Sequence, residues 1–288
     1  MKTDPLPRPP QSLRPDRMES MNAPSQKPAV TLAPGVTLDC LVGGHNQARG
    51  ITTGLVMFEP QSILSYHTHP VSESITVLSG AVVMGVEGRE YTLGPLDNIV
   101  IPRELAHASW TTSTTGRAVL HAALASEAPR RDFVDAPTER RAMPMESTSV
   151  AGKERVTRFD TALRFEAGPG TSFIDHFNRD LVPGIEMSGG YGLFAPDGRL
   201  PAHFHDFDES ICIIHGTATC VVEGRRHTMS DCATALQPRG RVHYFINESA
   251  APMAMLWVYA GPLPERIVVD ERCATVEGNP WKDETLQT

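Results

Sequence analysis

One group of histidine, glutamate, glycine and proline residues occurs twice in the chain, with the same spacing both times. The first copy is His67, His69, Glu73, Gly80, Pro102 and His107, and the second is His203, His205, Glu209, Gly216, Pro238 and His243. Each pair of equivalent residues is 136 positions apart, as 203 − 67 and 243 − 107 both show. A segment repeated without a gap indicates one structural unit that the chain uses twice.

Composition limits the class of protein. The 288 residues favour about two domains. A formal net charge of −8 without a dense Lys/Arg stripe argues against a nucleic-acid partner. No apolar run approaches the roughly 20 residues that span a bilayer, so no membrane partner is expected. Without an apolar signal core, and with five cysteines but no CxxC pair, the sequence predicts a reduced, cytoplasmic protein.

The pattern along the chain is that of an all-β protein. Short runs rich in β-forming residues, such as Ser74–Leu78, Ala81–Val86 and Asn98–Ile101, are separated by Gly and Pro turns. Closely spaced strands of this kind predict tandem β-barrels or sandwiches rather than βαβ units. A tight hairpin is expected at Glu87-Gly88.

Five regions are expected. They are a disordered Pro-rich tail (1–30), a first barrel (31–125), an interdomain crossing (126–165), a second barrel (166–261) and a C-terminal extension (262–288). The tail leaves Met18 and Met21 open as alternative starts. The crossing carries a charge run expected to be solvated, with room for a short helix. The last residues, from about Lys282, are expected to fray.

The repeated residues suit a metal centre in each barrel. Alternate strand residues share a face, so His67 and His69 point the same way, and Glu73 can return to that face. His107 must come from another hairpin, and the same reasoning applies to the second copy. Mixed nitrogen and oxygen ligands favour one divalent transition metal per barrel, with Fe or Mn preferred and Ni, Cu, Co and Zn allowed. If the metal prefers six ligands, the four protein ligands leave about two coordination positions for substrate, O2 or water.

Three further residues are candidates for binding substrate. Arg103 and Arg239 are equivalent, and each follows the motif proline, where a guanidinium could pair with a carboxylate. The alternative is a loop arginine that bonds backbone carbonyls. His121 is equivalent to Trp257 at the same offset and would serve the first site if it faces inward. The alternative is a histidine that faces outward.

These motifs resemble those of the cupins, and in particular the two-domain bicupins. The segments HTHPVSESITVLSG (67–80) and HFHDFDESICIIHG (203–216) match the first cupin motif, and PRGRVHYFIN (238–247) matches the second. The first repeat departs at Glu104 and Thr111, where glycine and asparagine are usual, and Leu96 and Cys232 replace another glycine. The resemblance implies two jelly-roll barrels. If only one site is active, the second repeat is the more typical.

The resemblance also suggests a reaction class. It points to quercetinase-like dioxygenases, with a small oxygenated acid or enol as substrate and Glu73 and Glu209 as both ligands and proton acceptors. A manganese-dependent decarboxylase of the oxalate type is the alternative, although Leu64 and Leu200 stand where that resemblance calls for arginine. A non-catalytic, pirin-like regulator is a third reading, but such proteins lack a second intact cluster. A homo-oligomer through the remaining sheet edges stays open.

Overall fold

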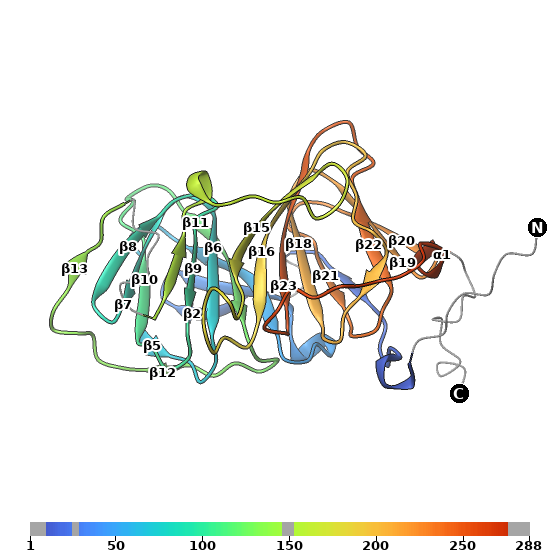
Figure 1. Ribbon diagram of the computed structural model, residues 1–288. Coiled ribbons are helices and arrows are strands. Elements are labelled where there is room, and N and C mark those ends of the chain that lie inside the picture. The colour runs from blue at the N-terminus through green and yellow to red at the C-terminus, as the bar shows by residue number, and fades with distance from the viewer. Residues whose placement is uncertain (1–9, 25–28, 146–152, 276–288) are drawn as a thin grey trace, which may run out of the picture.

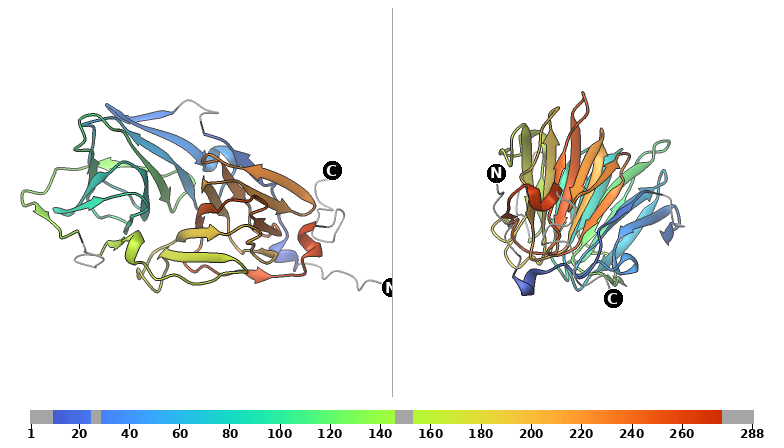
Figure 2. Two further views of the ribbon diagram at one scale, coloured as in Figure 1. Left: turned by 90° about the horizontal axis from the view of Figure 1, so that it is seen from above. Right: turned by 90° about the vertical axis from the view of Figure 1, so that its right-hand side faces the viewer.

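The computed structural model describes residues 10–24, 29–145 and 153–275. Two β-barrels lie side by side, the first at the left of Figure 1 and the second at the right. Each barrel is made of two facing sheets, which Figure 2 shows from two further directions. The predicted all-β fold of tandem jelly-roll barrels is confirmed. In the described part of the chain, no helix is long and apolar enough to cross a membrane.

The first barrel joins a seven-stranded sheet to a six-stranded one. The first sheet runs β14 (Arg155–Thr157), β9 (Asn98–Ile101), β6 (Glu73–Ser79), β11 (Ala118–Leu124), β4 (Thr52–Phe58), β3 (Val36–Val42), β2 (Val30–Ala33). The second runs β12 (Asp132–Phe133), β5 (Ile63–Thr68), β10 (His107–Trp110), β7 (Val82–Val86), β8 (Arg89–Leu93), β13 (Arg141–Ala142). Their inward apolar side chains form one continuous core.

The second barrel joins a six-stranded sheet to a five-stranded one. The first sheet runs β1 (Ser20–Asn22), β21 (Thr234–Gln237), β18 (Glu209–His215), β23 (Met253–Tyr259), β16 (Ser188–Phe194), β15 (Thr171–Phe177). The second runs β20 (Arg225–Met229), β19 (Ala218–Val222), β22 (His243–Ile246), β17 (His203–Phe204), β24 (Ile267–Val268). Helices are short and peripheral: η1 (Gln11–Leu13), η2 (Gly44–Asn46), η3 (Phe159–Thr161) and α1 (Arg272–Thr275).

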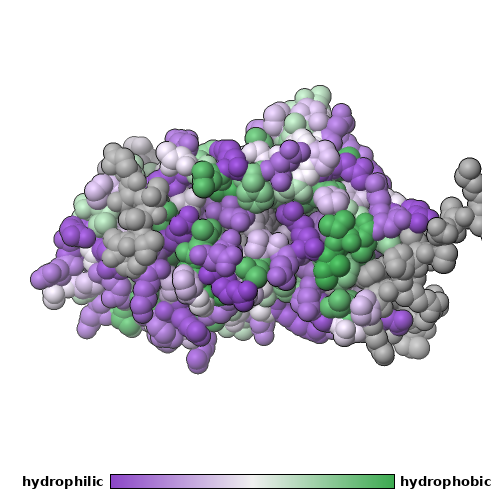
Figure 3. Space-filling model, viewed as in Figure 1, coloured by the Kyte–Doolittle hydropathy of each residue, from purple (hydrophilic) through white to green (hydrophobic). Residues whose placement is uncertain are grey.

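The strands expected from the sequence are present. The predicted runs correspond to β6, β7 and β9. Glu87 and Gly88 both have positive φ, 48° and 81°, as a tight two-residue hairpin requires. None of the five cysteines forms a disulfide in the described structure. The surface in Figure 3 is mainly hydrophilic, with a hydrophobic patch over the second barrel.

The larger sheets of the two barrels pack against each other. Side chains from both barrels, including Val100 and Ala123 of the first and Leu236 and Val258 of the second, form a shared apolar cluster. The hydroxyls of Thr53 and Ser210 meet across this interface at 2.7 Å. Burial of this apolar surface holds the two barrels together as a pseudo-dimer.

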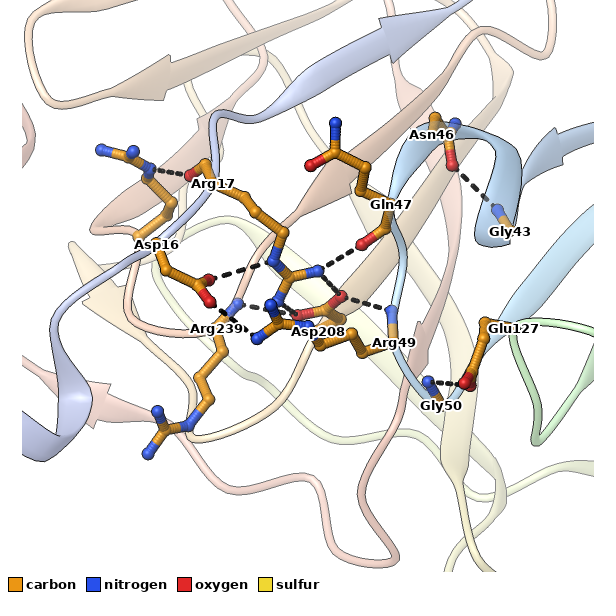
Figure 4. A network of polar contacts seen from close by, with 11 residues as sticks. Asp16, Arg17, Gly43, Asn46, Gln47, Arg49, Gly50, Glu127, Asp208 and Arg239 are labelled. Carbon is orange, nitrogen blue, oxygen red and sulfur yellow. Dashed lines mark hydrogen bonds and ion pairs between the residues drawn. The ribbon is translucent and has the colours of Figure 1, made fainter. Parts of the chain in front are cut away.

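The N-terminal segment is not a disordered tail over residues 10–24, contrary to expectation. Its strand β1 pairs with β21 of the second barrel. Arg17 forms a two-pronged ion pair with Asp208 at 2.7 and 2.8 Å (Figure 4). Asp208 also accepts backbone N–H bonds from Arg49 and Arg239, so three parts of the chain meet there. Residues 1–9 and 25–28 lie outside the described residues, as does the C-terminal part of the extension, 276–288.

The segment expected to cross between the barrels extends the first barrel instead. Its strands β12, β13 and β14 pair with β5, β8 and β9. The short helix is the 3-10 turn η3. The charge run is only partly solvated: Arg140 and Arg141 are exposed, but Arg131 is half-buried beside the first histidine cluster. The interpretation of the whole run as solvated surface is therefore wrong for Arg131.

Two buried histidines at the interface are expected to make folding sensitive to acid. Burial lowers the pKa of His121 to about 4 and that of His176 to about 3, and the Nε2 atoms of both lack a partner among the described residues. Asp97 and Arg155 are the other charged groups that influence His176. Below an ordinary pKa of about 6.5 the unfolded chain binds protons that the folded chain excludes, so stability falls as pH drops toward 4.

The expected loss between pH 7.5 and pH 5 is about 2 kcal/mol for each of these histidines. Urea unfolding of the metal-free protein at both pH values measures it. The variant His121→Leu should lose about 2 kcal/mol less than the parent over this range, since the metal-centre histidines contribute equally to both. An identical pH dependence in parent and variant would contradict the assignment.

Candidate metal centres

Three strands bring the first set of predicted ligands together. His67 lies in β5 and His69 just beyond it, Glu73 opens β6, and His107 opens β10 directly opposite His67. One ligand atom from each of the four lies within 4.8 Å of every other. All four side chains are buried. The four residues predicted from the sequence are therefore one cluster inside the first barrel.

The second barrel repeats this arrangement. His203 lies in β17 opposite His243 of β22, and Glu209 opens β18. Together with His205 these residues bring their ligand atoms within the same 4.8 Å limit. All four side chains are buried here as well.

The hydrogen bonds of the six histidines fix their tautomers for metal binding. Each Nδ1 lies within hydrogen-bonding distance of a backbone carbonyl, which can only accept. In the order His67, His69, His107, His203, His205 and His243, the carbonyls belong to Ser65, Arg130, Leu105, Pro201, Glu265 and Arg241, at distances between 2.5 and 2.9 Å. Each Nδ1 is therefore a donor, and Nε2 is the atom left to bind an ion.

The Nε2 atoms point into the clusters. Those of His67, His69, His203 and His205 are buried without a hydrogen bond in the described structure. The Nε2 atoms of His69 and His205 nevertheless lie 3.6 and 3.2 Å from the carboxylates of Glu73 and Glu209. Those of His107 and His243 lie 2.8 Å from the carboxylates of Glu73 and Glu209. Buried polar atoms without partners are costly, and a divalent cation would satisfy all of them together. The donor set thus fits a transition-metal ion in each barrel.

The protonation states of the cluster residues also favour metal binding. Burial lowers the pKa of His67 to about 3 and holds that of His203 well below its usual range. Burial also opposes ionisation of Glu73 and Glu209, but hydrogen bonds and the charges of nearby histidines bring both carboxyl pKa values below normal. Neutral imidazoles with an ionised carboxylate are the forms that bind metal.

The cupin domain family matches residues 54–123 and 190–259, one match in each barrel and each containing a complete cluster. The protein is a bicupin. No curated sequence matches the bicupin significantly. Among solved structures, the Lactobacillus farciminis oxalate decarboxylase formate complex has a TM-score of 0.69 at 13% identity, covering 90% of this chain and 91% of that one.

Two other solved structures are similarly related. Bacillus subtilis oxalate decarboxylase has a TM-score of 0.67 at 13% identity, over 90% of this chain and 81% of that one. Procruciferin, an 11S globulin from Brassica napus, has a TM-score of 0.71 at 10% identity, over 92% and 89%. Identities this low establish the shared fold alone, which a decarboxylase and a globulin have in common.

The departures from the cupin glycine pattern affect turns and leave the ligands in place. Glu104, Leu96 and Cys232 adopt positive φ angles of 66°, 66° and 62°, which glycine accepts more readily. Gly240, the equivalent of Glu104, also has positive φ, at 82°. A Cβ there would collide with the carbonyl of Leu13. The bicupin needs glycine at this turn of its second barrel, because the N-terminal segment covers that turn. It does not cover the equivalent turn of the first barrel in the described structure.

The interiors of the two barrels differ in polarity near the clusters. In the first barrel, Ile101 and Leu124 lie opposite Glu73. Their counterparts opposite Glu209 in the second are Gln237 and Tyr259. The ring of Tyr259 lies 4.4 Å from that of His205. Gln237 and Tyr259 could not be predicted as site residues from the sequence, because a glutamine or tyrosine in a strand has no motif of its own.

His121 does not lie at the first metal centre, and its predicted equivalence with Trp257 is wrong. Trp257 pairs with Ile211 of β18. The counterpart of Ile211 in the first barrel is Ile75, and Ile75 pairs with Ala122. The loop 111–117 is one residue longer than the loop 247–252, so the offset becomes 135 beyond it. A shift of one residue reverses the face of a strand, and His121 therefore faces the interface.

Arg103 and Arg239 lie in the equivalent turns and face acidic neighbours. Arg103 is exposed, with one guanidinium nitrogen 3.7 Å from Glu186. The Nε of Arg239 donates to Asp206 at 2.5 Å. Neither side chain bonds to a cluster residue in the described part of the structure, so their predicted contact with substrate stays a prediction.

Two other arginines lie closer to the clusters. Arg131 and Arg266 follow their barrels at the 135-residue offset, within Pro129-Arg130-Arg131 and Pro264-Glu265-Arg266. Their charges act on the pKa values of His67 and His203 respectively. A comparison of the repeats at a fixed offset of 136 misses this match, whereas a one-residue gap would have revealed it.

Proposed function

We propose that this bicupin is a metal-dependent enzyme that carries one divalent transition metal in each barrel, with iron or manganese the first candidates. Its most favoured reaction is a dioxygenase-type oxidation of a small oxygenated organic acid or enol. The observation that supports this most directly is the convergence of buried imidazole Nε2 atoms without partners on one carboxylate in each barrel. Such a site binds an ion and leaves coordination positions open.

The protein residues would orient and balance the centre. When bound, the metal would supply a Lewis acid that holds a substrate oxygen or O2. The six Nδ1–carbonyl bonds fix the imidazole rings. Glu73 and Glu209 would offset the charge of the ion and accept a proton from substrate. If one barrel acts alone, we expect it to be the second, because Gln237 and Tyr259 offer polar groups there and the first offers aliphatic ones.

Decarboxylation is the second candidate function. The oxalate decarboxylases share the bicupin fold over about 90% of this chain. Leu64 and Leu200 still weigh against it, since arginine is absent from those positions. A pirin-like regulatory role is less favoured because two clusters are intact. The partner would be a small molecule, and assembly into a homo-oligomer stays a prediction for size-exclusion chromatography.

Metal content and gas exchange test the proposal together. Inductively coupled plasma mass spectrometry on untagged protein should find about two equivalents of metal per chain. A panel of small carboxylic acids and enols is then screened with an oxygen electrode and a CO2 detector. Substrate-dependent O2 uptake supports the dioxygenase, and CO2 release without O2 uptake supports the decarboxylase. Absence of metal after reconstitution with Fe²⁺ or Mn²⁺ would refute the proposal.

A further inference from the structure

The segment that follows each barrel folds back onto the strand that carries the first two histidines. In the first barrel β12 pairs with β5, and in the second β24 pairs with β17. Figure 1 shows the C-terminal segment running from β23 across the second barrel to α1. The carbonyls of Arg130 and Glu265, which hold His69 and His205, belong to these segments. The backbone that holds the ligand histidine in each barrel therefore also positions the side chain of the residue that follows the bonded carbonyl.

That next side chain is an arginine in both barrels. Phe133 pairs with His67 and Asp132 with Thr68, so the register continued by one residue puts Arg131 opposite His69. Directly opposed residues of an antiparallel pair project from the same face. The contact between the rings of Phe133 and His67, at 6.1 Å, agrees with this register. Arg131 therefore projects from the face that carries the histidine ligands.

Arg266 takes the corresponding place in the second barrel. Val268 pairs with His203 and Ile267 with Phe204, which puts Arg266 opposite His205. Its Nε donates to the hydroxyl of Tyr259 at 3.3 Å, and that ring packs against His205. Its guanidinium carbon lies 5.5 Å from the ring centre of Phe173, a core residue of the same barrel. These contacts connect Arg266 to the second cluster.

Neither arginine is neutralised by an ion pair in the described structure. Arg131 is half-buried, and its Nε is buried without a hydrogen-bond partner among the described residues. Burial lowers its pKa, and the nearby Glu73 carboxylate opposes that effect. Near Arg266, the carboxylates of Glu209 and then Asp175 contribute negative charge, but neither forms an ion pair with it in the described structure, and Asp175 accepts a hydrogen bond from Asn178 instead. A partly buried guanidinium without a carboxylate partner is a binding position for an anion.

We propose that Arg131 and Arg266 are the anion-binding positions of the two metal centres, and that each centre takes a small carboxylate. One carboxylate oxygen would face the cluster and the other would accept hydrogen bonds from the guanidinium. The inference rests on the proposed function, and it narrows the substrate class to carboxylic acids over neutral enols. It also assigns substrate binding to arginines in the segments that follow each barrel in sequence, in place of the turn residues Arg103 and Arg239.

Formate binding to cobalt-loaded protein tests this proposal one centre at a time. His203→Ala leaves only the first centre, and His67→Ala leaves only the second. The visible absorption of Co²⁺ in each background is titrated with sodium formate. Adding Arg131→Met to the first background, or Arg266→Met to the second, should raise the formate Kd at least about tenfold, because a charge-assisted bond is lost. Lysine at the same position should restore part of the affinity, since it keeps the charge without the fork.

Surface arginines supply matched controls. Arg117 and Arg226 are exposed and paired with Glu59 and Glu248, so their methionine variants should change the formate Kd less than twofold. The proposal is overturned if Arg131→Met and Arg266→Met keep their cobalt and the parental formate affinity, or if formate does not bind the parent. A parent that takes up no cobalt would instead refute the proposed metal-dependent function. A methionine variant that fails to fold is replaced by the lysine variant, which must still weaken formate binding several-fold.

Discussion

Arg17→Met is expected to lower the free energy of unfolding by about 3–5 kcal/mol, because it leaves the buried carboxylate of Asp208 without its charged partner. Asp208 is 2% exposed and Arg17 is 8% exposed, so water cannot replace the lost guanidinium. Two backbone N–H groups would still bind Asp208, which places the expected value toward the lower end. Chemical unfolding of parent and variant measures the difference.

A surface ion pair provides the control for this substitution. The Arg226–Glu248 pair is about half exposed on both sides, so Arg226→Met should cost no more than about 1 kcal/mol. The double variant Arg17→Met/Asp208→Asn should recover part of the loss, because no buried charge is stranded. Equal destabilisation by Arg17→Met and Arg226→Met would show that the buried pair contributes no more than a surface pair.

Glu209→Gln is expected to remove the metal of the second barrel and, with it, most of the turnover. Glutamine keeps the shape of the side chain but not the negative charge that offsets the ion. Metal content should fall from about two equivalents to about one, and turnover by roughly 100-fold or more, since even residues behind the ligands affect metal sites by 10–100-fold. Mass spectrometry and the substrate assay measure the two effects.

The matched variant Glu73→Gln separates the two barrels. It should remove the metal of the first barrel while retaining more turnover than Glu209→Gln, if the second barrel carries the chemistry. Circular dichroism should be unchanged for both, because the clusters are only one part of each buried core. Turnover lost in Glu73→Gln and preserved in Glu209→Gln would assign catalysis to the first barrel.

The ligands could be predicted because they form a local and repeated signal. A His-x-His pair on one strand has a fixed geometry, and a gap-free repeat makes coincidence implausible. The strands could be predicted for the same reason, since Gly80 and Gly88 mark turns that need positive φ. Short-range pattern was enough to locate both clusters within the barrels.

The order of the N-terminal segment could not be predicted, because its stabilising contacts are far away in sequence. Arg17 and Asp208 are separated by 191 positions, and prolines around Arg17 suggest an unpacked chain. Arg131 was missed for a related reason. A charge run resembles solvated surface until β12 is known to pair with β5. Both residues depend on tertiary pairing that local sequence does not encode.

The length difference between the repeats lies outside the part that holds the clusters. From the first to the last histidine ligand each repeat spans the same interval, 107 − 67 = 243 − 203 = 40, and the extra residue lies in the loop 111–117. A chimera that combines strands of the two barrels within one domain must therefore change its alignment within this hairpin. If the strand after this loop were joined at the 136-residue offset, its register would shift by one residue. His121 would then face the core in place of Ala122, and we expect the hybrid to misfold.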